Sequence, residues 1–488
     1  DRLSPESVAA IPPNARPPIA PADLSTGIVH IGLGAFHRAH QAVFTQDAIA
    51  ASGDTSWGIA GVAPHSRGTV DALRAQGGLY TVLERDGDAA IPRVVGVHTA
   101  AVHAPSTPHD VLAGIAAPAT RVVTLTVTEK GYRADQAGRL LMDEPTRADL
   151  AGGGPSTVLG LLVGGLAARM RADAGPIAIA CCDNLCGNGG FLRRIVLQYA
   201  QRSTGGPALC DWIGGHVGFP TSVVDRIVPA TTDRDGVDTA ALLGCRDDAV
   251  VVAEPFRQWV ITEDFPAGRP AWERAGAVFT EDVTAYEECK LRSLNATHSM
   301  LAYLGLLCGY TYIADAVGDS LLGEAARAFL AQDVTPTLRA PEGLDLAAYQ
   351  RNVLHRFGNA ALGHRADQVG SDGSQKLPVR LVPVVRDRLA AGAAPRWSAL
   401  LIAAWLRVLV TGQAQDGTPV RVHDPMAAEV ARRCPAAVSG DAAALLRIGA
   451  IFGDDLADNA ELGALIDDHL ASLARHGVRA TVAGLLGG

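Results

Sequence analysis

Lysine is nearly absent from this chain of 488 residues, which carries three lysines against thirty-nine arginines. Two of the three lie inside the densest clusters of polar side chains; the lysines are Lys130, Lys290 and Lys376. Arginine keeps its proton in proteins, whereas a lysine drawn into apolar surroundings can give its proton up and act as a base. A composition biased toward arginine explains the scarcity of lysine but not these positions, so Lys290 is the first candidate for proton transfer.

Several other features are missing, and each absence argues against a class of protein. No uninterrupted apolar run reaches the roughly 18 residues of a membrane-spanning helix, and the proline-rich segment 11–18 is not a signal peptide. The net charge of −9 argues against nucleic acid or an anionic membrane as the main partner. The eight cysteines are scattered, without a Cys-x-x-Cys pair or the spacing of a zinc site. We therefore expect a protein of the reduced cytoplasm, without a disulfide framework and without a metal.

Strands alternate with helices in the first part of the chain. Apolar, β-branched runs predict strands at 27–34, 57–62, 121–127 and 176–180. Helical segments lie between them, at 36–51 and 157–173. This alternation predicts an α/β fold with a parallel, doubly wound, Rossmann-like sheet.

The pattern changes after about Asp282. Amphipathic or wholly apolar helical runs dominate from there, at 289–307, 320–332, 346–357, 383–391, 397–410, 442–451 and 461–475. We expect a dinucleotide-binding domain at 1–282 and a mostly α-helical domain at 283–488 that binds substrate and carries the catalytic residues. The stretch 236–270 has no clear assignment, apart from a strand at 249–252.

The first strand ends in Gly32-Leu-Gly34 and is followed by a helix, which is the beginning of a dinucleotide fingerprint. The first glycine permits the tight turn, and the second lets the backbone approach a pyrophosphate at the start of the helix. His37 stands where the usual pattern has its third glycine, which weakens the motif. We expect Gly32, Gly34, Phe36 and His37 to bind the cofactor; a plain strand-to-helix turn is the alternative.

The end of the second strand normally carries an acidic residue that binds the adenosine ribose and favours NAD. Here the segment 63–68 contains no acid, and Arg67 with Ser66 could instead hold a 2′-phosphate. Arg67 is alternatively a solvated loop residue. NAD is the expected cofactor, and NADP stays open.

Lys290, Asn295 and His298 fall on one predicted helix, within an arc of about 140° on α-helical geometry. Leucines around Lys290 surround its stem with apolar groups, which suits a general base. Neutral Asn295 can donate to an oxygen that gains negative charge. Glu287 precedes the lysine by three residues and could pass protons to solvent. The alternative is a surface lysine paired with Glu287.

A second polar cluster, Cys182-Asp-Asn184, follows directly on the strand at 176–180. Ligands bind at the carboxyl ends of strands in parallel sheets, so Asn184 is expected near the nicotinamide. Asn184 and Asn295 meeting Lys290 would make a preorganised oxyanion site. Asp183 could equally be a turn former.

These segments together resemble the polyol-specific long-chain dehydrogenases, the family of mannitol 2-dehydrogenase and fructuronate reductase. The matching stretches run in family order, at 27–41, 128–132, 182–184, 224–229, 253–259, 286–298 and 372–376. The spacing Lys-x4-Asn-x2-His, with Asp-Asn upstream, is a specific signature. The matches extend over most of the chain.

The resemblance implies a metal-independent transfer of hydride between a nicotinamide cofactor and a secondary alcohol or ketone. It makes Lys290 the catalytic acid–base and makes Asn184 and Asn295 the oxyanion donors. It also implies roles for four further side chains: His298 and Lys376 bind substrate hydroxyls, Asp225 lies at the boundary of cofactor and substrate, and Glu287 gates proton exchange.

Two departures from the family pattern bear on the cofactor and the substrate. Mannitol dehydrogenases carry an acidic pair after the second strand, which this chain lacks. They also resemble one another in having an arginine at the position of Gln368, which lies in the expected substrate site. Interconversion of mannitol and fructose is the leading interpretation; fructuronate reduction and arabinitol oxidation are the alternatives. A carboxylate substrate would want an arginine, for which Arg292 and Arg380 are candidates.

An interpretation from another class is a silent nucleotide-binding sensor on the same fold, which the complete set of proton-transfer residues disfavours. The expected partners are a small polyol, ketose or sugar acid. A two-domain chain can enclose a site by itself, so a monomer is sufficient.

Overall fold

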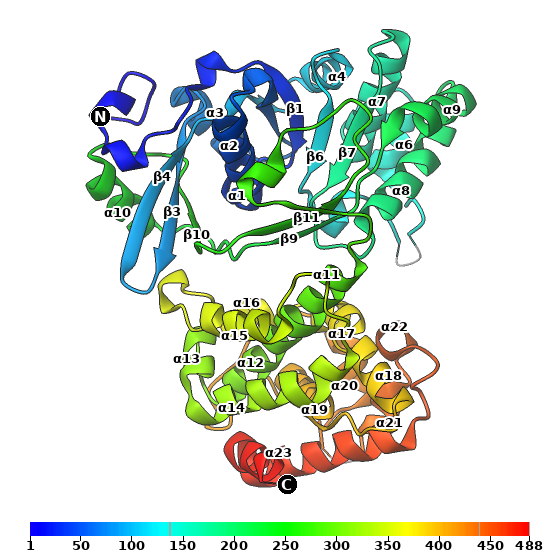
Figure 1. Cartoon of the computed structure of the whole chain (residues 1–488). Helices are drawn as coiled ribbons and strands as arrows, with labels where there is room; N and C mark the ends of the chain where they lie inside the picture. Colours follow the sequence, from blue (N-terminus) through cyan, green and yellow to red (C-terminus); the bar gives the residue numbers. More distant parts are fainter. Residues whose placement is uncertain (136–137, 439, 488) are drawn as a thin grey trace. The chain divides into compact units, whose positions relative to one another are not determined.

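The computed structural model describes residues 1–135, 138–438 and 440–487 and divides into two units, Asp1–Val283 and Thr284–Gly488. Unit 1 is built on β-sheets with helices around them, and unit 2 is almost wholly helical (Figure 1). The expected fold class, a Rossmann-like α/β domain followed by a mostly α-helical one, is confirmed.

A six-stranded parallel sheet forms the centre of unit 1. Its order is β5 (His98–His103), β2 (Gly58–Ala63), β1 (Thr26–Ile31), β6 (Val122–Leu125), β7 (Ile177–Cys181) and β8 (Val217–Gly218). The chain builds outward from β1 through β2 to β5 and then returns to the other side of β1 with β6. Open parallel sheets bind ligands beyond the carboxyl ends of the strands at such a switch point. The turns after β1 and β6 are therefore the expected ligand-binding edge.

Helices cover both faces of this sheet, which is why its strands are apolar on both faces. Ile28 faces a core shared with α2 (Gln41–Ser52) and α3 (Arg67–Ala75). Its neighbour Val29 faces a second core. The helices of that second core are α4 (Pro108–Ala116), α7 (Val158–Arg171) and α8 (Asn188–Arg202), which gather beside β6 and β7 in Figure 1. Successive strand residues thus alternate between the two cores.

Two three-stranded sheets complete the strands of unit 1. One has the order β10 (Val251–Ala253), β3 (Tyr80–Asp86), β4 (Ala89–Val95), and the other β12 (Val278–Thr280), β11 (Gln258–Thr262), β9 (Ser222–Asp225). The strand expected at 249–252 is present as β10, whereas the antiparallel hairpin of β3 and β4 was not predicted. The remaining α-helices are α1 (Ala35–Ala39), α5 (Thr128–Gly131), α6 (Glu144–Leu150), α9 (Gly206–His216) and α10 (Asp233–Leu243).

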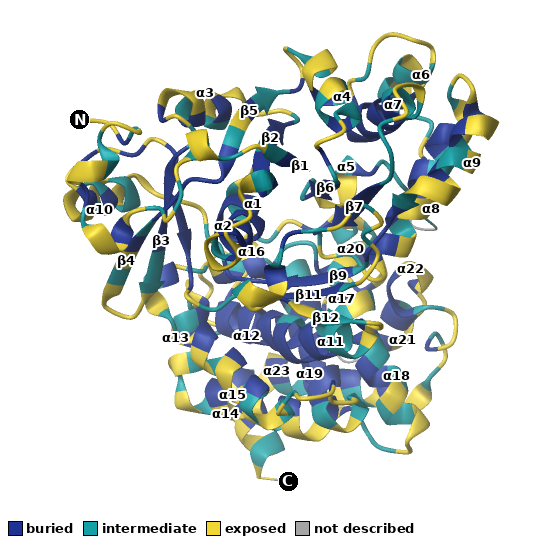
Figure 2. Cartoon of the chain, turned by 45° about the horizontal axis from the view of Figure 1, so that its top comes forward, coloured by how far each residue is buried: buried dark blue, intermediate teal, exposed yellow. Residues whose placement is uncertain are grey.

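Unit 2 begins with one continuous helical segment. It consists of α11 (Thr284–Glu288), a π-helical turn (Cys289–Asn295) and α12 (Ala296–Leu307). Every residue of α12 is buried, including the polar Thr297, His298 and Ser299 near its start. Figure 2 shows α12 and α19 (Arg396–Thr411) as the buried helices of this unit.

The other helices of unit 2 surround α12 and α19. They are α13 (Ile313–Gly318), α14 (Ser320–Phe329) with a π turn (Leu330–Val334), α15 (Leu346–Phe357), α16 (Ala366–Gly370), α17 (Gly373–Arg380), α18 (Val382–Ala390), α20 (Ala427–Arg433), α21 (Ala442–Leu446), α22 (Gly449–Phe452) and α23 (Ala460–Leu486). The helix expected at 442–451 is divided into α21 and α22. The last helix runs further than expected and breaks at Gly477, where φ is 80° and ψ is 177°.

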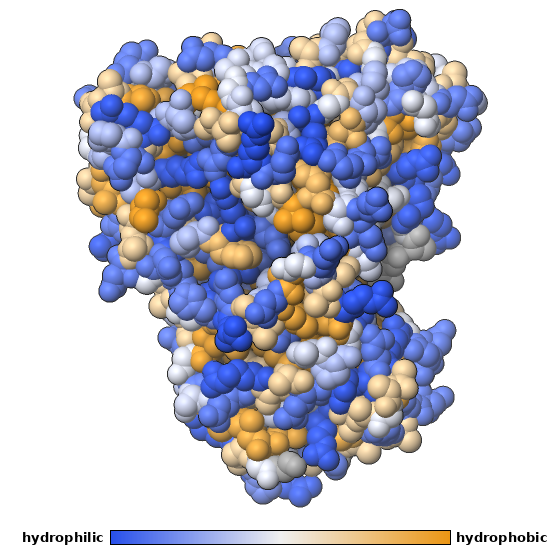
Figure 3. All heavy atoms as spheres, in the orientation of Figure 1, coloured by the Kyte–Doolittle hydropathy of each residue, from blue (hydrophilic) through white to orange (hydrophobic). Residues whose placement is uncertain are grey.

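Hydrophilic and hydrophobic side chains are interspersed over the face drawn in Figure 3. Within the described part of the chain, no helix combines the length and the hydropathy that crossing a bilayer needs.

Candidate functional site

The turn after β1 requires glycine at position 32. Gly32 has a φ of +110°, and a Cβ at this position would lie 2.0 Å from the carbonyl oxygen of Thr126, which follows β6. The N–H groups of Gly32 and Leu33 donate to the carbonyl oxygen of Val62 at 2.9 and 3.1 Å. The turn is therefore held between the ends of β1, β2 and β6, and a side chain at position 32 would push β6 away.

Gly34 leaves the outer side of this turn open. It is exposed, and a Cβ added there would meet only the carbonyl oxygen of Gly32, at 3.8 Å. Its N–H donates to that same oxygen at 2.6 Å. The open backbone lies at the carboxyl end of β1, where such sheets bind the phosphates of dinucleotides. The residues present therefore fit a dinucleotide.

Phe36 and His37 follow within α1 and lie at different depths. Phe36 is half-buried, with its ring 5.0 Å from that of His40. His37 is fully buried, and its ring stacks on that of His30 at 3.3 Å. His37 thus lies beneath the turn, which differs from its expected place among the cofactor contacts, because this side of α1 packs against the sheet.

Arg67 begins α3 directly after β2 and is well exposed. Its Nε lies 3.3 Å from Oδ2 of Asp71, which is also exposed. Exposed pairs of this kind contribute little to stability, so the guanidinium can leave Asp71 at small cost. Arg67 therefore stands where the adenosine ribose is bound in this type of fold, with a charge that suits a phosphate.

Asp183, the residue before Asn184, fixes the loop that follows β6. Its carboxylate accepts hydrogen bonds from the N–H groups of Val127 and Thr128, at 2.9 and 3.0 Å, and from the hydroxyl of Tyr132 at 2.6 Å. Thr128 has a φ of +63°, a conformation that needs such support. Burial raises the pKa of Asp183. Asp183 is thus an anchor between two strand ends, and Asn184 lies exposed in the bend after it.

Asp225 closes β9 and is buried, opposite Gln258 of β11. The next residue, Arg226, donates to the carbonyl oxygen of Ala39 at 2.5 Å and to Oε1 of Glu84 at 2.5 Å. These contacts tie the end of β9 to α1 and to β3. Asp225 is therefore held in a fixed position at the end of its strand.

Lys290 and Asn295 lie in a π-helical turn rather than in the α-helix that the sequence predicts. In this turn the N–H of Ala296 donates to the carbonyl oxygen of Leu291, five residues earlier. Residues five apart point about 140° apart in an α-helix, whereas the wider π turn brings them closer to one line. The predicted arc is wrong for this pair, and the amine and the amide point more nearly the same way. Turns of this kind recur at functional sites.

Lys290 is 6% exposed, and Asn295 is half-buried. Within the described chain the Oδ1 atom of Asn295 has no hydrogen-bond partner. Its backbone oxygen accepts from Nη1 of Arg380 at 3.4 Å and from the hydroxyl of Ser299 at 3.2 Å. A buried amide oxygen without a partner is costly. A ligand group would complete it, and either amide atom can be turned toward that group.

His298 stacks on Phe357, with ring centroids 4.5 Å apart, and meets His364 edge-on at 4.6 Å. Its Nε2 has no partner among the residues that the structure describes. Burial holds the pKa of His298 well below its ordinary value, and the positive charges of Arg380, Lys376 and Arg356 lower it further. The neutral ring has one donor and one acceptor nitrogen, which suits a hydroxyl.

Lys376 lies on α17, and its Nζ donates to the carbonyl oxygen of Val369 at 3.1 Å. Val369 belongs to α16 together with the exposed Gln368. The start of α17 is fixed by Asp424, whose carboxylate accepts from the N–H and the hydroxyl of Ser374, at 2.8 and 2.5 Å. Lys376 and Gln368 are thus brought into one region by the joint between α16 and α17.

The two arginines considered for a carboxylate differ in their surroundings. Arg292 donates to Asp387 at 2.6 Å and to Glu288 at 3.2 Å, so two acids already neutralise it. Arg380 donates to the backbone oxygen of Asn295 at 3.4 Å, and its positive charge lowers the pKa of His298. Arg380 therefore lies with the predicted substrate residues, whereas Arg292 does not. Glu287 is half-buried in α11, three residues before the lysine.

His364 and Asp424 belong to this region and were not predicted. Burial lowers the pKa of His364 to about 4, so this ring is also neutral at pH 7. Asp424 is buried beneath α17. Each lies far along the chain from the residue it contacts and outside any motif, so the sequence carried no signal for either.

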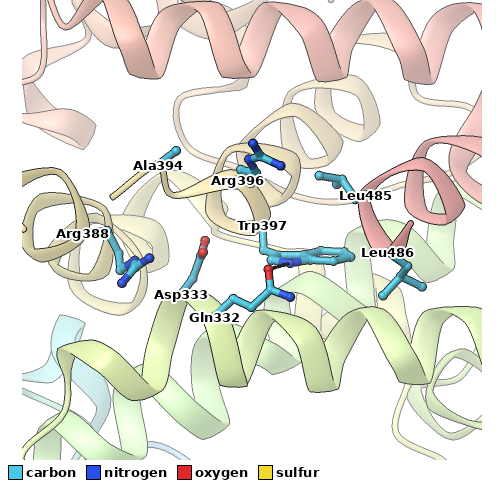
Figure 4. Close-up of a pocket in the computed structure, with 8 residues that line it drawn as sticks. All are labelled: Gln332, Asp333, Arg388, Ala394, Arg396, Trp397, Leu485 and Leu486. Atoms are coloured by element: carbon cyan, nitrogen blue, oxygen red, sulfur yellow. Dashed lines mark hydrogen bonds between the residues drawn. The ribbon is translucent and has the colours of Figure 1, made fainter. Parts of the chain in front are cut away.

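A cavity of about 360 Å³ lies elsewhere in unit 2 (Figure 4). Three of its polar side chains are engaged in packing: Trp397 donates to Gln332 at 3.0 Å, and Asp333 accepts from the N–H and the hydroxyl of Ser398. None of the predicted site residues lines it. The π turn therefore stays the candidate site, and this cavity offers no alternative set of the predicted residues. In the described ranges, no three His, Cys, Asp or Glu side chains group as a metal ion would need.

Two family models match nearly the whole chain. The mannitol dehydrogenase Rossmann domain matches residues 26–274, and the mannitol dehydrogenase C-terminal domain matches residues 282–474.

Curated relatives and solved structures agree with these matches. The chain is 40% identical to the D-mannonate oxidoreductase of Escherichia coli (strain K12), over 97% of this chain and 98% of the relative. It is 36% identical to a mannitol 2-dehydrogenase of Phaeosphaeria nodorum, over 94% of this chain and 81% of the relative. The solved Pseudomonas fluorescens mannitol 2-dehydrogenase, a ternary complex with NAD and D-mannitol, is 35% identical with a TM-score of 0.89, covering 100% of both chains. The expected resemblance is thereby confirmed, and the chain belongs to the mannitol dehydrogenase family of oxidoreductases.

Proposed function

We propose that this protein transfers hydride between NAD and a secondary alcohol group of a small polyol, with the interconversion of mannitol and fructose as the leading reaction. The observation that carries the proposal is the buried Lys290 on the same π turn as Asn295. The mannitol 2-dehydrogenase relative and the solved complex with NAD and D-mannitol support this substrate and this cofactor.

Lys290 is the acid–base of this mechanism. In the oxidation its neutral amine accepts the proton of the substrate hydroxyl, and in the reduction its ammonium returns a proton to the carbonyl oxygen. The nicotinamide, when bound, would accept hydride from the substrate carbon that carries this oxygen, or donate hydride to it in the reverse direction. Glu287, on the preceding helical turn, passes protons between Lys290 and solvent.

Asn295 stabilises the substrate oxygen while it carries negative charge. Its amide N–H₂ can donate without competing for the proton, because an amide does not titrate. The bonds from Arg380 and Ser299 to its backbone oxygen fix its position. Asn184, exposed after β7, is the second oxyanion donor of the proposal.

The cofactor would be held at the carboxyl edge of the sheet in unit 1. Gly32 and Gly34 give the backbone of the turn, Phe36 packs against the cofactor, and Asp225 lies where cofactor and substrate meet. Arg67 would face the adenosine ribose, where its charge tolerates a 2′-phosphate as well as a hydroxyl. The activity assay below therefore compares NADPH with NADH as the cofactor.

Substrate hydroxyls would bind to His298, Lys376 and Gln368. The neutral imidazole of His298 can accept or donate, the ammonium of Lys376 donates only, and the amide of Gln368 can do both. We expect one chain to carry out the reaction in the cytoplasm, with no nucleic acid or membrane as a partner.

A second candidate reaction is the reduction of fructuronate to mannonate. It is favoured by the positive charges of Lys376 and Arg380 around His298, which suit a substrate carboxylate. The D-mannonate oxidoreductase relative supports it as well. Gln368 stands in place of the arginine of mannitol dehydrogenases and would then mark the change of substrate.

Parallel assays of NADH and NADPH oxidation with fructose and with fructuronate test the two reactions. The experiment is run at neutral pH with a chelator present. Turnover with fructose is the expected result and makes Gln368 a tolerated change. Turnover with fructuronate alone would move the assignment to the sugar acid, and turnover with neither would contradict both.

Replacing Asn295 by alanine should lower kcat by about 10²- to 10³-fold, the usual loss for one oxyanion donor. The matched control is Asn352→Ala, the same change on the exposed face of α15, which should leave kcat unaltered. Steady-state kinetics separates the parameters. An effect confined to KM would contradict the oxyanion role and make Asn295 a residue that only positions the substrate.

A further inference from the structure

Three buried histidines lie directly beneath the glycine turn. His30 in β1, His37 in α1 and His98 in β5 are 0%, 0% and 1% exposed. The rings of His30 and His37 are stacked, with centroids 3.3 Å apart and 9° between their planes. Nε2 of His37 lies 3.1 Å from Nε2 of His98. The three imidazoles form a continuous series from β5 through α1 to β1, which we call the histidine stack.

The inner end of the histidine stack holds the carbonyl group of Gly32. Nε2 of His30 lies 2.9 Å from this oxygen and 2.9 Å from the hydroxyl oxygen of Thr126. Because a carbonyl oxygen can only accept, Nε2 carries the proton, and the Thr126 oxygen can share it. Nδ1 of His30 then accepts from the hydroxyl of Thr124 at 2.7 Å. The hydroxyl of Thr126 donates to the same carbonyl at 2.9 Å. Two side-chain donors thus fix the peptide of Gly32 at its positive φ.

The orientation of this carbonyl also sets the open side of the turn. The N–H of Gly34 donates to the Gly32 oxygen at 2.6 Å, so a rotation of the Gly32 peptide would displace Gly34. Gly34 is the residue whose outer side is open to a ligand. The imidazole of His30 therefore acts on the backbone that faces the cofactor, without reaching the cofactor itself.

The contact between His37 and His98, at the outer end of the histidine stack, carries an energetic cost. Two neutral rings that meet through Nε2 share one proton there, so the other ring must carry its proton on Nδ1. Neither Nδ1 of His37 nor Nδ1 of His98 has a partner among the described residues. One buried N–H is thus left without an acceptor, which is costly, and apolar rings would pack here without that cost. The arrangement calls for a reason other than stability.

The rings stay neutral at pH 7. Burial lowers the pKa of His30 and of His98 to about 3 and that of His37 well below its ordinary value, and the nearby Arg38 adds to the shift for His37 and His98. A neutral His30 keeps one donor for Gly32 and one acceptor for Thr124, whereas a doubly protonated ring would donate at both nitrogens and the Thr124 hydroxyl would have to accept instead.

We propose that His30, His37 and His98 are positioning residues for the dinucleotide, through the hydrogen bond from His30 to the Gly32 carbonyl. His37 holds the His30 ring by stacking, and His98 holds His37. In the dinucleotide fingerprint the third glycine allows the helix to pack closely on the strand. His37 takes its place in this chain, so the histidine stack forms the contact between α1 and β1 instead. This inference rests on the proposed use of a nicotinamide dinucleotide.

The test is a fluorescence titration of the full chain with NADH and with NADPH, without substrate. His30→Leu, which removes the donor, should raise the Kd for the preferred cofactor by about tenfold. Glutamine can place an amide N–H near the position of Nε2, so His30→Gln should stay within about threefold of the wild type. The KM for the cofactor should rise in the same proportion as Kd, and the exposed His109→Leu serves as the matched control.

Melting temperatures without cofactor separate this role from a purely structural one. A folded His30→Leu with the Kd of the wild type overturns the proposal, and so does a glutamine variant that binds as weakly as the leucine variant. If His30→Leu does not fold, the Kd of His98→Phe tests the proposal instead. A Kd raised by about threefold supports a positioning role for the histidine stack, and an unaltered Kd overturns it. A wild-type chain that binds neither NADH nor NADPH would overturn the cofactor assignment itself.

Discussion

Lys290→Met should lower kcat by about 10³-fold or more, because general acid–base catalysis contributes about 10²- to 10⁴-fold and no second proton carrier is proposed at this position. Methionine keeps the length of the buried stem without an amine. The Kd for NADH should remain that of the wild type, since the proposed cofactor contacts lie in unit 1. Single-turnover kinetics with fructose and NADH, at several pH values, checks the expectation.

The informative control for this variant is Lys290→Arg. Arginine keeps the positive charge but cannot release its proton, so it should be as inactive as the methionine variant if proton transfer is the role. Activity retained by the arginine variant would show that only the charge is needed. Near-normal turnover of Lys290→Met across pH would contradict the acid–base assignment altogether.

The free energy of unfolding should fall steeply as the pH drops below about 6.5, the ordinary pKa of histidine. Burial lowers the pKa of His30, His40 and His98 in the folded chain to about 3. Between these two pKa values the unfolded chain binds protons that the folded chain does not. Stability is therefore complete above pH 6.5 and is lost as the pH falls toward 3, by about 1.4 kcal/mol per pH unit for each histidine.

These three histidines together contribute about 4 kcal/mol per pH unit near pH 5. His37, His298 and His364, whose pKa burial also lowers, add to this slope. Burial also raises the pKa of Asp183 and Asp247, which offsets part of the slope at the acidic end. Denaturant unfolding at pH 7, 6 and 5, followed by tryptophan fluorescence, measures the slope directly.

His98→Phe should reduce this slope by about 1.4 kcal/mol per pH unit, because it removes one proton taken up on unfolding. The exposed His109→Gln is the control and should leave the slope as it is. A slope that His98→Phe does not reduce would mean that His98 is already protonated in the folded chain. The slope is the informative quantity, since loss of the contact with His37 lowers stability equally at all pH values.

The sheet of unit 1 was predictable because its strands are continuous apolar runs. The run at 176–180 is β7 (Ile177–Cys181), and the run at 121–127 contains β6 (Val122–Leu125). The hairpin of β3 and β4 was missed because its strands mix polar and apolar residues, with a burial pattern that alternates only in part. Helix α15 has the predicted bounds, Leu346–Phe357, because Asp345 caps its start by accepting from the N–H of Ala348.

The candidate site was only partly predictable. Lys290, Asn295 and His298 were found from their types and spacing, and their catalytic roles stay predictions. The geometry of the segment was not foreseen, because a π turn has no distinct pattern of apolar residues and depends on the packing around the helix. Likewise, His37 was placed among the cofactor contacts because a motif position does not tell which side of a short helix faces the sheet.

The sequence by itself determined the α/β alternation, the glycine turn, the helical second half and the family, because each depends on residue types at fixed spacings along the chain. Only the tertiary structure decided that Asp183 anchors the loop after β6, that Lys290 lies on a π turn and that His30 bonds the Gly32 carbonyl in a stack with two further buried histidines. The physical reason is that these features are set by contacts between residues tens of positions apart. Burial then determines which of those groups are charged and which hydrogen bonds they can make.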